Sequence, residues 1–315
     1  MKQNVHLSKW LRNGGTLLAL IIMCAVFASQ SATFFTGKNA INIFQASSIN
    51  ALVALGMTMV IILGGIDLSV GSIAALSAVF MADMMVNFSL PWVLCLILAL
   101  ALGVLCGAVN AFLVAVVKLQ PFIVTLGTMS LYRAIALLYT DGNPIFNLPS
   151  GFRRVITAYL WGLPAPVYFV LVMTAITWII LNRMPLGEYV VATGGNEEAA
   201  TISGVPVVRT KVFTYCFCGF LSALAAAILV GRLGAAEPIV GSNWELNAIA
   251  SAAIGGASLS GGKGSAVGTI LGAVILGTLI NGLTLMNVQA FWQLAATGAI
   301  ILIAMIVDRA ARGKE

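Results

Sequence analysis

Charged side chains are scarce in this chain. Asp, Glu, Lys and Arg make up only 8% of its 315 residues, whereas a soluble domain carries about 25%. So few charges cannot cover a water-facing surface, which excludes an ordinary soluble domain. Hydrophobic residues make up 60% of the chain and the mean hydropathy is +1.04. The main solvent is therefore the lipid bilayer.

The chain has a single histidine and no C-x-x-C pair of cysteines. The one histidine, His6, lies in the N-terminal tail, so no serine–histidine dyad can form within the membrane. None of the five cysteines forms a C-x-x-C pair, and neither H-E-x-x-H nor a P-loop occurs. These absences favour a non-catalytic subunit without a metal site, a disulfide or its own ATP site of the P-loop type.

Long apolar runs fill most of the sequence. A helix needs roughly 20 apolar residues to cross the bilayer, so the length allows about ten spans and no separate soluble domain. Glycines rather than polar loops separate the second run from the third and the eighth from the ninth, which predicts interrupted helices. We therefore expect residues 1–315 to form one all-α polytopic membrane domain, with spans at 15–34, 46–64, 68–87, 91–117, 121–140, 163–182, 212–231, 246–261, 265–286 and 290–307.

Positive charges indicate the orientation. With both termini in the cytoplasm, the inner side receives many more of the Lys and Arg residues outside the spans than the outer side does, as the positive-inside rule requires. The polar loop 183–211 is then cytoplasmic and segment 141–162 is external. An alternative remains at the start, where residues 9–32 resemble a secretory signal peptide whose removal would leave nine spans. The inner set is Lys2, Lys9, Arg12, Lys118, Arg183, Arg209, Lys211, Lys263, Arg309, Arg312 and Lys314; the outer set is Lys38, Arg153, Arg154 and Arg232.

The loop 183–211 carries charges of both signs and contains the pattern E-A-A-x-x-x-G. Good helix formers with acids at the start predict a short helix over Asn196–Ile202, which Gly204 would end as a glycine just beyond the last turn. A short cytoplasmic helix of this kind can transmit force between two rigid bodies. Docking to a partner is favoured over a passive loop.

Candidate pathway residues lie in three regions. Asp67 follows two glycines at a break between apolar runs, and it either caps the next helix or lines a pathway; the cap is favoured. Arg133 lies within a span, where it snorkels, pairs with a buried acid or contacts a polar substrate, and structural pairing is favoured. Glu245 enters a span from the outer side.

Small residues recur in two patterns. Gly103 and Gly107, and likewise Gly264, Gly268 and Gly272, repeat every four residues, which predicts close helix packing within the subunit or across a homodimer. Residues 64–71 and 255–262 share G-G-x-x-L-S-x-G. This echo fits either an internal repeat or chance recurrence in a glycine-rich chain.

Several motifs in order along the chain resemble the ribose-type sugar-uptake permeases of the ATP-binding-cassette (ABC) family. They are GMTMVI at 56–61, GGIDLSVGS at 64–72, PFIVTLG at 121–127, GGN at 194–196, ELNAIA at 245–250, and GG with LSGGKG at 255–264. The G-G-I-D-L-S-V-G run is the most specific of these.

This resemblance implies a permease subunit of the bacterial inner membrane that imports a monosaccharide, ribose first, by alternating access. It implies a separate ATPase that binds ATP and Mg, a periplasmic sugar-binding protein and a second permease copy, with no cofactor in this subunit. Matched position by position, the resemblance implies that a coupling helix docks onto the ATPase through Glu197, Glu198, Ala199, Ala200 and Gly204. The tentative pathway residues are Asp67, Ser69, Arg133 and Glu245.

Other readings stay open. The substrate can be another pentose, a hexose or autoinducer-2. An ion-coupled transporter would usually carry ionisable residues in several spans, and here only Asp67, Asp83 and Arg133 qualify. A membrane-embedded enzyme lacks a catalytic constellation.

Overall fold

The computed structural model describes residue 18 and residues 20–312 of the chain. The described part is helical almost throughout, with one short antiparallel hairpin, β1–β2. Its first helix covers Leu20–Gln30. The labelled elements that follow are α2 (Gly37–Ile62), α3 (Val70–Val86), α4 (Trp92–Ala115), α5 (Pro121–Tyr139), α6 (Ser150–Ile156), β1 (Tyr159–Leu160), β2 (Leu163–Pro164), α7 (Ala165–Arg183), α8 (Pro185–Gly195), α9 (Glu197–Ile202), α10 (Val207–Leu233), α11 (Trp244–Ile254), α12 (Ala266–Leu285) and α13 (Ala290–Arg312).

The all-α polytopic prediction is confirmed, whereas the count of ten spans is not. In the described chain, six helices are long and apolar enough to cross a membrane: α2, α4, α5, α7, α10 and α12. Shorter apolar helices cover Leu20–Gln30, Val70–Val86 and Ala290–Ile303. The span predicted at 246–261 contains only α11, which ends at Ile254; its 11 residues extend about 16 Å, half the bilayer core.

Helix α2 begins at Gly37, well before the predicted span at 46–64. Its first turns carry polar residues, so an apolar window misses them. Thr36 caps the start, because its hydroxyl accepts a hydrogen bond from the Asn39 amide. Downstream, α2 is buried along most of its length. Two of the polar residues in its first half bond other helices: Asn39 bonds Asn281 of α12, and Asn50 bonds Ser251 of α11.

Helix α10 lies at the centre of the fold and packs against α2, α3 and α4. The glycine pair predicted as a packing face in α4 meets α10 within the subunit. A Cβ on Gly219 would lie 2.1 Å from the Gly103 carbonyl oxygen, and one on Gly107 would lie 2.3 Å from the Tyr215 carbonyl oxygen. Only glycine allows the two backbones to approach this closely.

Replacement of Gly219 by valine is therefore expected to destabilise the bundle. The added side chain must push α4 away from α10, and overpacking of this kind typically costs about 1–3 kcal/mol or more. The thermal unfolding midpoint of the purified subunit measures the loss. Gly127→Val is the matched control, since no atom lies within 4 Å of the Cβ it would add in helix α5. Equal unfolding midpoints for the two variants would contradict the close packing of α4 against α10.

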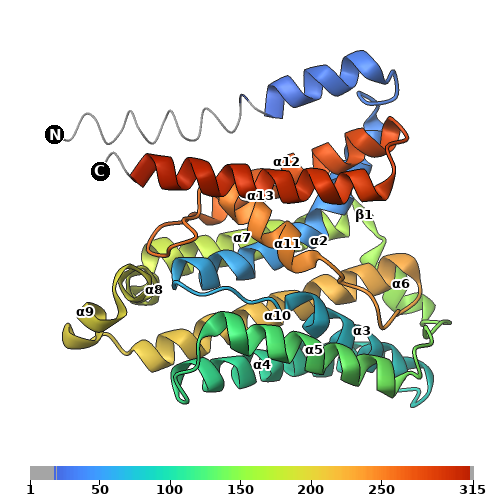
Figure 1. Cartoon of the computed structure of the whole chain (residues 1–315). Helices are drawn as coiled ribbons and strands as arrows, with labels where there is room; N and C mark the ends of the chain where they lie inside the picture. The colour runs from blue at the N-terminus through green and yellow to red at the C-terminus, as the bar shows by residue number, and fades with distance from the viewer. Residues whose placement is uncertain (1–17, 19, 313–315) are drawn as a thin grey trace.

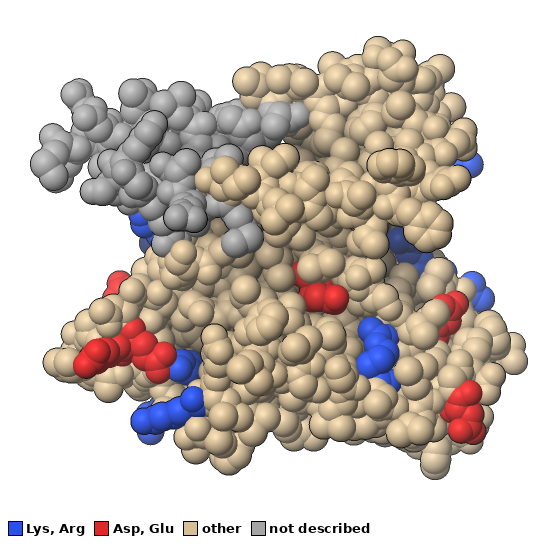
Figure 2. Space-filling model, viewed as in Figure 1, with Lys and Arg blue, Asp and Glu red and all other residues tan. Residues whose placement is uncertain are grey.

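The molecule has two distinct ends. Helices α8 and α9, the α4–α5 turn and the α11–α12 loop lie at the left in Figure 1, and α6 and the hairpin lie at the opposite end. On the face shown in Figure 2, charged side chains lie at both ends, and an acidic and a basic group also lie nearer its middle. Uncharged residues cover most of the rest of this face, as expected where lipid surrounds the protein. The predicted positions of both termini rest partly on residues 1–17 and 313–315, which lie outside the described residues.

Candidate functional site

The helix predicted over Asn196–Ile202 is present as α9, which covers Glu197–Ile202. The Asn196 side chain caps its start by accepting a hydrogen bond from the Ala199 amide at 2.9 Å. Glu197 and Glu198 occupy the first turn, where the helix dipole favours acids. Asn196 and the two glutamates after it are therefore enough to determine where this helix starts.

The end of α9 follows the predicted glycine stop. Gly204 has a φ of +82°, a left-handed conformation that glycine adopts without strain. Its amide donates to the Thr201 carbonyl and the Val205 amide donates to the Ala200 carbonyl, both at 3.0 Å. These two bonds form a Schellman motif. The chain can therefore turn sharply back into α10.

Most of the α9 surface is free. Ala200 is its one buried residue; Glu198, Ala199 and Thr201 are exposed, and Ile202 is 82% exposed. Figure 1 shows α9 at the extreme end of the molecule, beyond the helices long enough to span a membrane. An exposed isoleucine beside an exposed glutamate at a protruding tip suits contact with another protein. The docking role of these residues stays a prediction.

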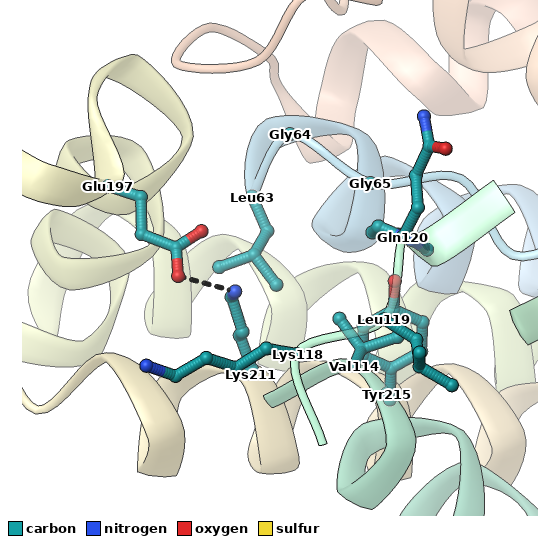
Figure 3. A pocket seen from close by; sticks show the side chains of 11 residues that line it. Leu63, Gly64, Gly65, Val114, Lys118, Leu119, Gln120, Glu197, Lys211 and Tyr215 are labelled. Carbon is teal, nitrogen blue, oxygen red and sulfur yellow. Dashed lines mark hydrogen bonds and ion pairs between the residues drawn. The ribbon is translucent and has the colours of Figure 1, made fainter. Parts of the chain in front are cut away.

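Glu197 makes a contact that the sequence did not reveal. Its carboxylate accepts a hydrogen bond from the Lys211 ammonium group at 2.6 Å, which links α9 to the first turns of α10 (Figure 3). The Lys211 side chain is only 12% exposed, and that of Glu197 is 56% exposed. An ion pair at a protein surface contributes roughly 0–1 kcal/mol. Its main effect is to hold the orientation of α9 relative to α10.

This ion pair borders a polar cavity of about 370 Å³ at the same end of the molecule (Figure 3). Lys118, Gln120 and the two glycines at 64 and 65 contribute to its wall. Tyr215 also lines it, and its buried hydroxyl has no hydrogen-bond partner among the described residues. The cavity therefore brings the α2–α3 break, the α4–α5 turn and the base of α9 together.

The end of α8 is locked against α2. A Cβ on Gly194 would lie 1.8 Å from the Ile62 carbonyl oxygen, and that oxygen accepts a hydrogen bond from the Gly262 amide at 2.8 Å. A Cβ on Gly261 would lie 3.1 Å from the Gly64 Cα. The two G-G-x-x-L-S-x-G segments thus meet each other and the end of α8. The end of α8 therefore lies in direct contact with the last turn of α2.

Asp67 and Ser69 lie in a buried polar cluster just before α3. One Asp67 oxygen accepts hydrogen bonds from the Ser69 amide at 2.9 Å and the Ser69 hydroxyl at 2.6 Å. Asn110 of α4 donates to the Ser69 hydroxyl at 2.8 Å. All three residues have no exposed surface. Asp67 satisfies backbone at the helix start, as a capping residue does, although Ser69 itself is the residue at the cap position.

Asn110 was missed in the sequence analysis. The sequence does carry a sign that Asn110 is buried. Gly103, Gly107 and Asn110 follow one another at spacings of four and three residues, so they share the face of α4 that packs against the other helices. Tyr132 of α5 donates a hydrogen bond to the Cys106 carbonyl at 3.0 Å beside this cluster.

Replacement of Asn110 by alanine is expected to lower the free energy of unfolding by about 1–3 kcal/mol, because buried acceptors on Ser69 and Asp67 lose their donor. The thermal unfolding midpoint checks this. Asn182→Ala removes a comparable side chain from an exposed position on α7, where it bonds only the Trp178 carbonyl, and should change the midpoint little. A midpoint for Asn110→Ala that equals the control would refute the role of this cluster.

Arg133 and Glu245 come together at a second place. The Arg133 guanidinium donates to the carbonyls of Pro238 and Val240 at 2.8 and 2.7 Å, which ties α5 to the loop before α11. Both charged residues line one cavity of about 470 Å³, together with Ser72 of α3. Of the four tentative pathway residues, the structure therefore places two at this cavity and two in the buried cluster.

Comparisons with known proteins agree on a permease component of a transport system. A family model described as "Branched-chain amino acid transport system / permease component" matches residues 39–305. The chain is similar to the ribose import permease protein RbsC of Bacillus subtilis, with 44% identity over 98% of this chain and 96% of the relative. It is also similar to RbsC of Escherichia coli K12, with 41% identity over 95% and 94%, and to the D-allose transport system permease protein AlsC of the same strain, with 39% identity over 94% and 91%. No solved structure matches.

Proposed function

This chain belongs to the branched-chain amino acid transport system permease family, and we propose that within it the chain is the membrane subunit of an ATP-driven monosaccharide importer, with D-ribose as its first substrate. The observation that carries this proposal is the match to permeases named for ribose, 41–44% identical over nearly the whole of both chains. The relatives compared above are named for sugars rather than for amino acids. A sugar is therefore favoured over a branched-chain amino acid.

The importer works by alternating access. Two ATPase subunits close on ATP and Mg, which they bind themselves, and move the exposed α9 of each of two permease copies. The Glu197–Lys211 pair passes this displacement to α10, and the contact of Gly194 with Ile62 passes it to α2. Because α2 and α10 form the buried centre of the bundle, their tilt opens one side of the membrane and closes the other. The subunit itself holds no cofactor and catalyses no reaction.

The remaining parts of the proposal concern surroundings and topology. A periplasmic sugar-binding protein delivers the substrate at the end opposite α9, and a second copy of this chain completes the pathway. The protein is a multi-pass protein of the bacterial inner membrane, with α9 and both termini in the cytoplasm. The shorter apolar helices and α11 with its following loop complete ten spans.

Transport by the reconstituted complex tests the substrate. The chain is placed in proteoliposomes with its ATPase and binding protein, and uptake of radiolabelled D-ribose is followed with ATP supplied on the α9 side. Unlabelled D-ribose should compete strongly and D-allose more weakly. If D-allose competed better and accumulated faster, the substrate would be a hexose; if neither sugar accumulated, D-ribose and D-allose would both be excluded as substrates.

A further inference from the structure

A polar cavity lies between α2, α10, α11 and α12, away from the site already described. Its volume is about 410 Å³, within the range of roughly 300–1,000 Å³ found for small-molecule sites. Asparagine side chains dominate its polar lining, and an arginine and a tryptophan join them. These six residues are Asn42, Asn50, Asn247, Asn281, Arg232 and Trp244.

Some of these polar groups hold the walls together. Asn281 exchanges two hydrogen bonds with Asn39, at 2.9 and 3.0 Å, which ties α12 to α2. Asn50 donates to the Ser251 hydroxyl at 2.7 Å, which ties α2 to α11. The cavity is therefore a built feature between fixed helices, not a gap left by loose packing.

Other polar groups that line the cavity have no partner in the described chain. The side chains of Asn42, Asn247 and Arg232 form no hydrogen bond with another described residue. Ser47 also lines the cavity, and its buried hydroxyl is without a hydrogen-bond partner among the described residues. Its oxygen would lie 2.0 Å from a Cβ on residue 277, so Gly277 leaves room for it. Unpaired polar groups are costly inside a membrane protein, and where they occur they commonly mark a ligand pathway.

The chemistry of the lining selects a class of ligand. No acidic side chain is among the described residues that line the cavity, which disfavours a metal ion or an organic cation. An amide side chain both donates and accepts hydrogen bonds, as a hydroxyl group does, and arginine adds further donors. The Trp244 ring offers a flat apolar surface with one N–H donor, which suits the C–H face of a sugar ring.

From these observations we propose that the cavity between α2, α10, α11 and α12 is a binding site for a neutral monosaccharide. This inference rests on the proposed function and adds a substrate site within the permease itself. The site lies far from α9: Asn42 and Ile62 are 20 residues apart on α2, which separates them by about 30 Å. The sugar thus enters this cavity from the side opposite the docking helix, before the bundle changes conformation.

Protection of a cysteine by sugar tests the site directly. Ala46 lines the cavity and is exposed to it, so Ala46→Cys gives a small reactive reporter. The complete complex in proteoliposomes is treated with a membrane-impermeant maleimide, and the labelling rate is measured with and without D-ribose. Because only the empty fraction of sites reacts, ribose at about ten times its dissociation constant should slow labelling about tenfold. Asn42→Cys is a second reporter in case the first variant does not assemble.

Three controls make the result specific. The wild-type complex reports any labelling of its native cysteines. Asn143→Cys places a thiol in the exposed turn after α5, where ribose should have no effect. Adding Asn247→Ala to the Ala46→Cys variant should abolish protection. Labelling of the Ala46→Cys variant at a rate that ribose does not change, as expected if a lipid headgroup filled the cavity, would overturn the site. Equal protection of the Ala46→Cys and Asn143→Cys variants would overturn it too.

Failure of the site can be told apart from failure of the proposed function. ATP-driven ribose accumulation by the wild-type complex, without protection of the Ala46→Cys variant, would overturn the site and leave the importer in place. Protection of that variant without any ATP-driven accumulation by the wild type would support the site and contradict the importer.

Discussion

Reversing the charge of Glu198 is expected to abolish ATP-driven sugar uptake while leaving the subunit inserted in the membrane. Glu198 is exposed in the first turn of α9 and forms no ion pair with another described residue, so its replacement disturbs little within the chain. A lysine there costs α9 about 0.3–1 kcal/mol through the helix dipole. The larger effect is expected at the interface, because a partner surface that complements Glu198 would be basic, and like charges brought together there are strongly unfavourable. Co-purification of the ATPase with Glu198→Lys measures the loss.

Glu237→Lys is the matched control. It makes the same charge change at an exposed position before α11, on the loop that Arg133 holds, away from α9. The control variant should retain its ATPase. If Glu198→Lys retained the ATPase as the control does and supported normal uptake, α9 would not be the docking element.

The second large effect is expected at Gly194. An alanine Cβ there would lie 1.8 Å from the Ile62 carbonyl oxygen, so α8 must move away from the end of α2. Because α8 leads directly into α9, this movement should break the proposed path from α9 to α2. We expect Gly194→Ala to lose ATP-driven uptake, and its unfolding free energy to fall by about 1–3 kcal/mol through overpacking.

The neighbouring glycine provides the control. A Cβ on Gly195 meets no atom within 4 Å, so Gly195→Ala adds the same methyl group one residue away without a clash. This variant should transport like the wild type. Normal uptake by Gly194→Ala would show that the contact between α8 and α2 carries no coupling. A variant that binds ATPase and hydrolyses ATP without transport would locate the defect in coupling rather than in assembly.

The features predicted best from sequence are those fixed by neighbouring residues. The start of α9 follows from Asn196 and two acids, and its end follows from Gly204, so a few consecutive residues suffice. The break after Ile62 follows in the same way from Gly64 and Gly65, whereas the predicted span at 246–261 runs past the end of α11 at Ile254.

Features that depend on distant residues could not be predicted. In the early first turns of α2, Asn39 exchanges hydrogen bonds with Asn281 of α12, a partner about 240 residues away in the sequence. The Arg133 guanidinium bonds backbone carbonyls of a loop about a hundred residues away, where the residue type leaves no signal. Lys211 lies 14 residues from Glu197, and only the fold reveals that they meet.

ATP dependence of ribose accumulation is the most direct test of the whole mechanism. Proteoliposomes that contain the chain, its ATPase and its binding protein are loaded with ATP or with ADP, and the ratio of internal to external D-ribose is measured at steady state. An importer driven through α9 should raise this ratio well above one with ATP and leave it at one with ADP. Accumulation that is equally strong with ADP, or that follows an ion gradient instead, would contradict an ATP-driven importer.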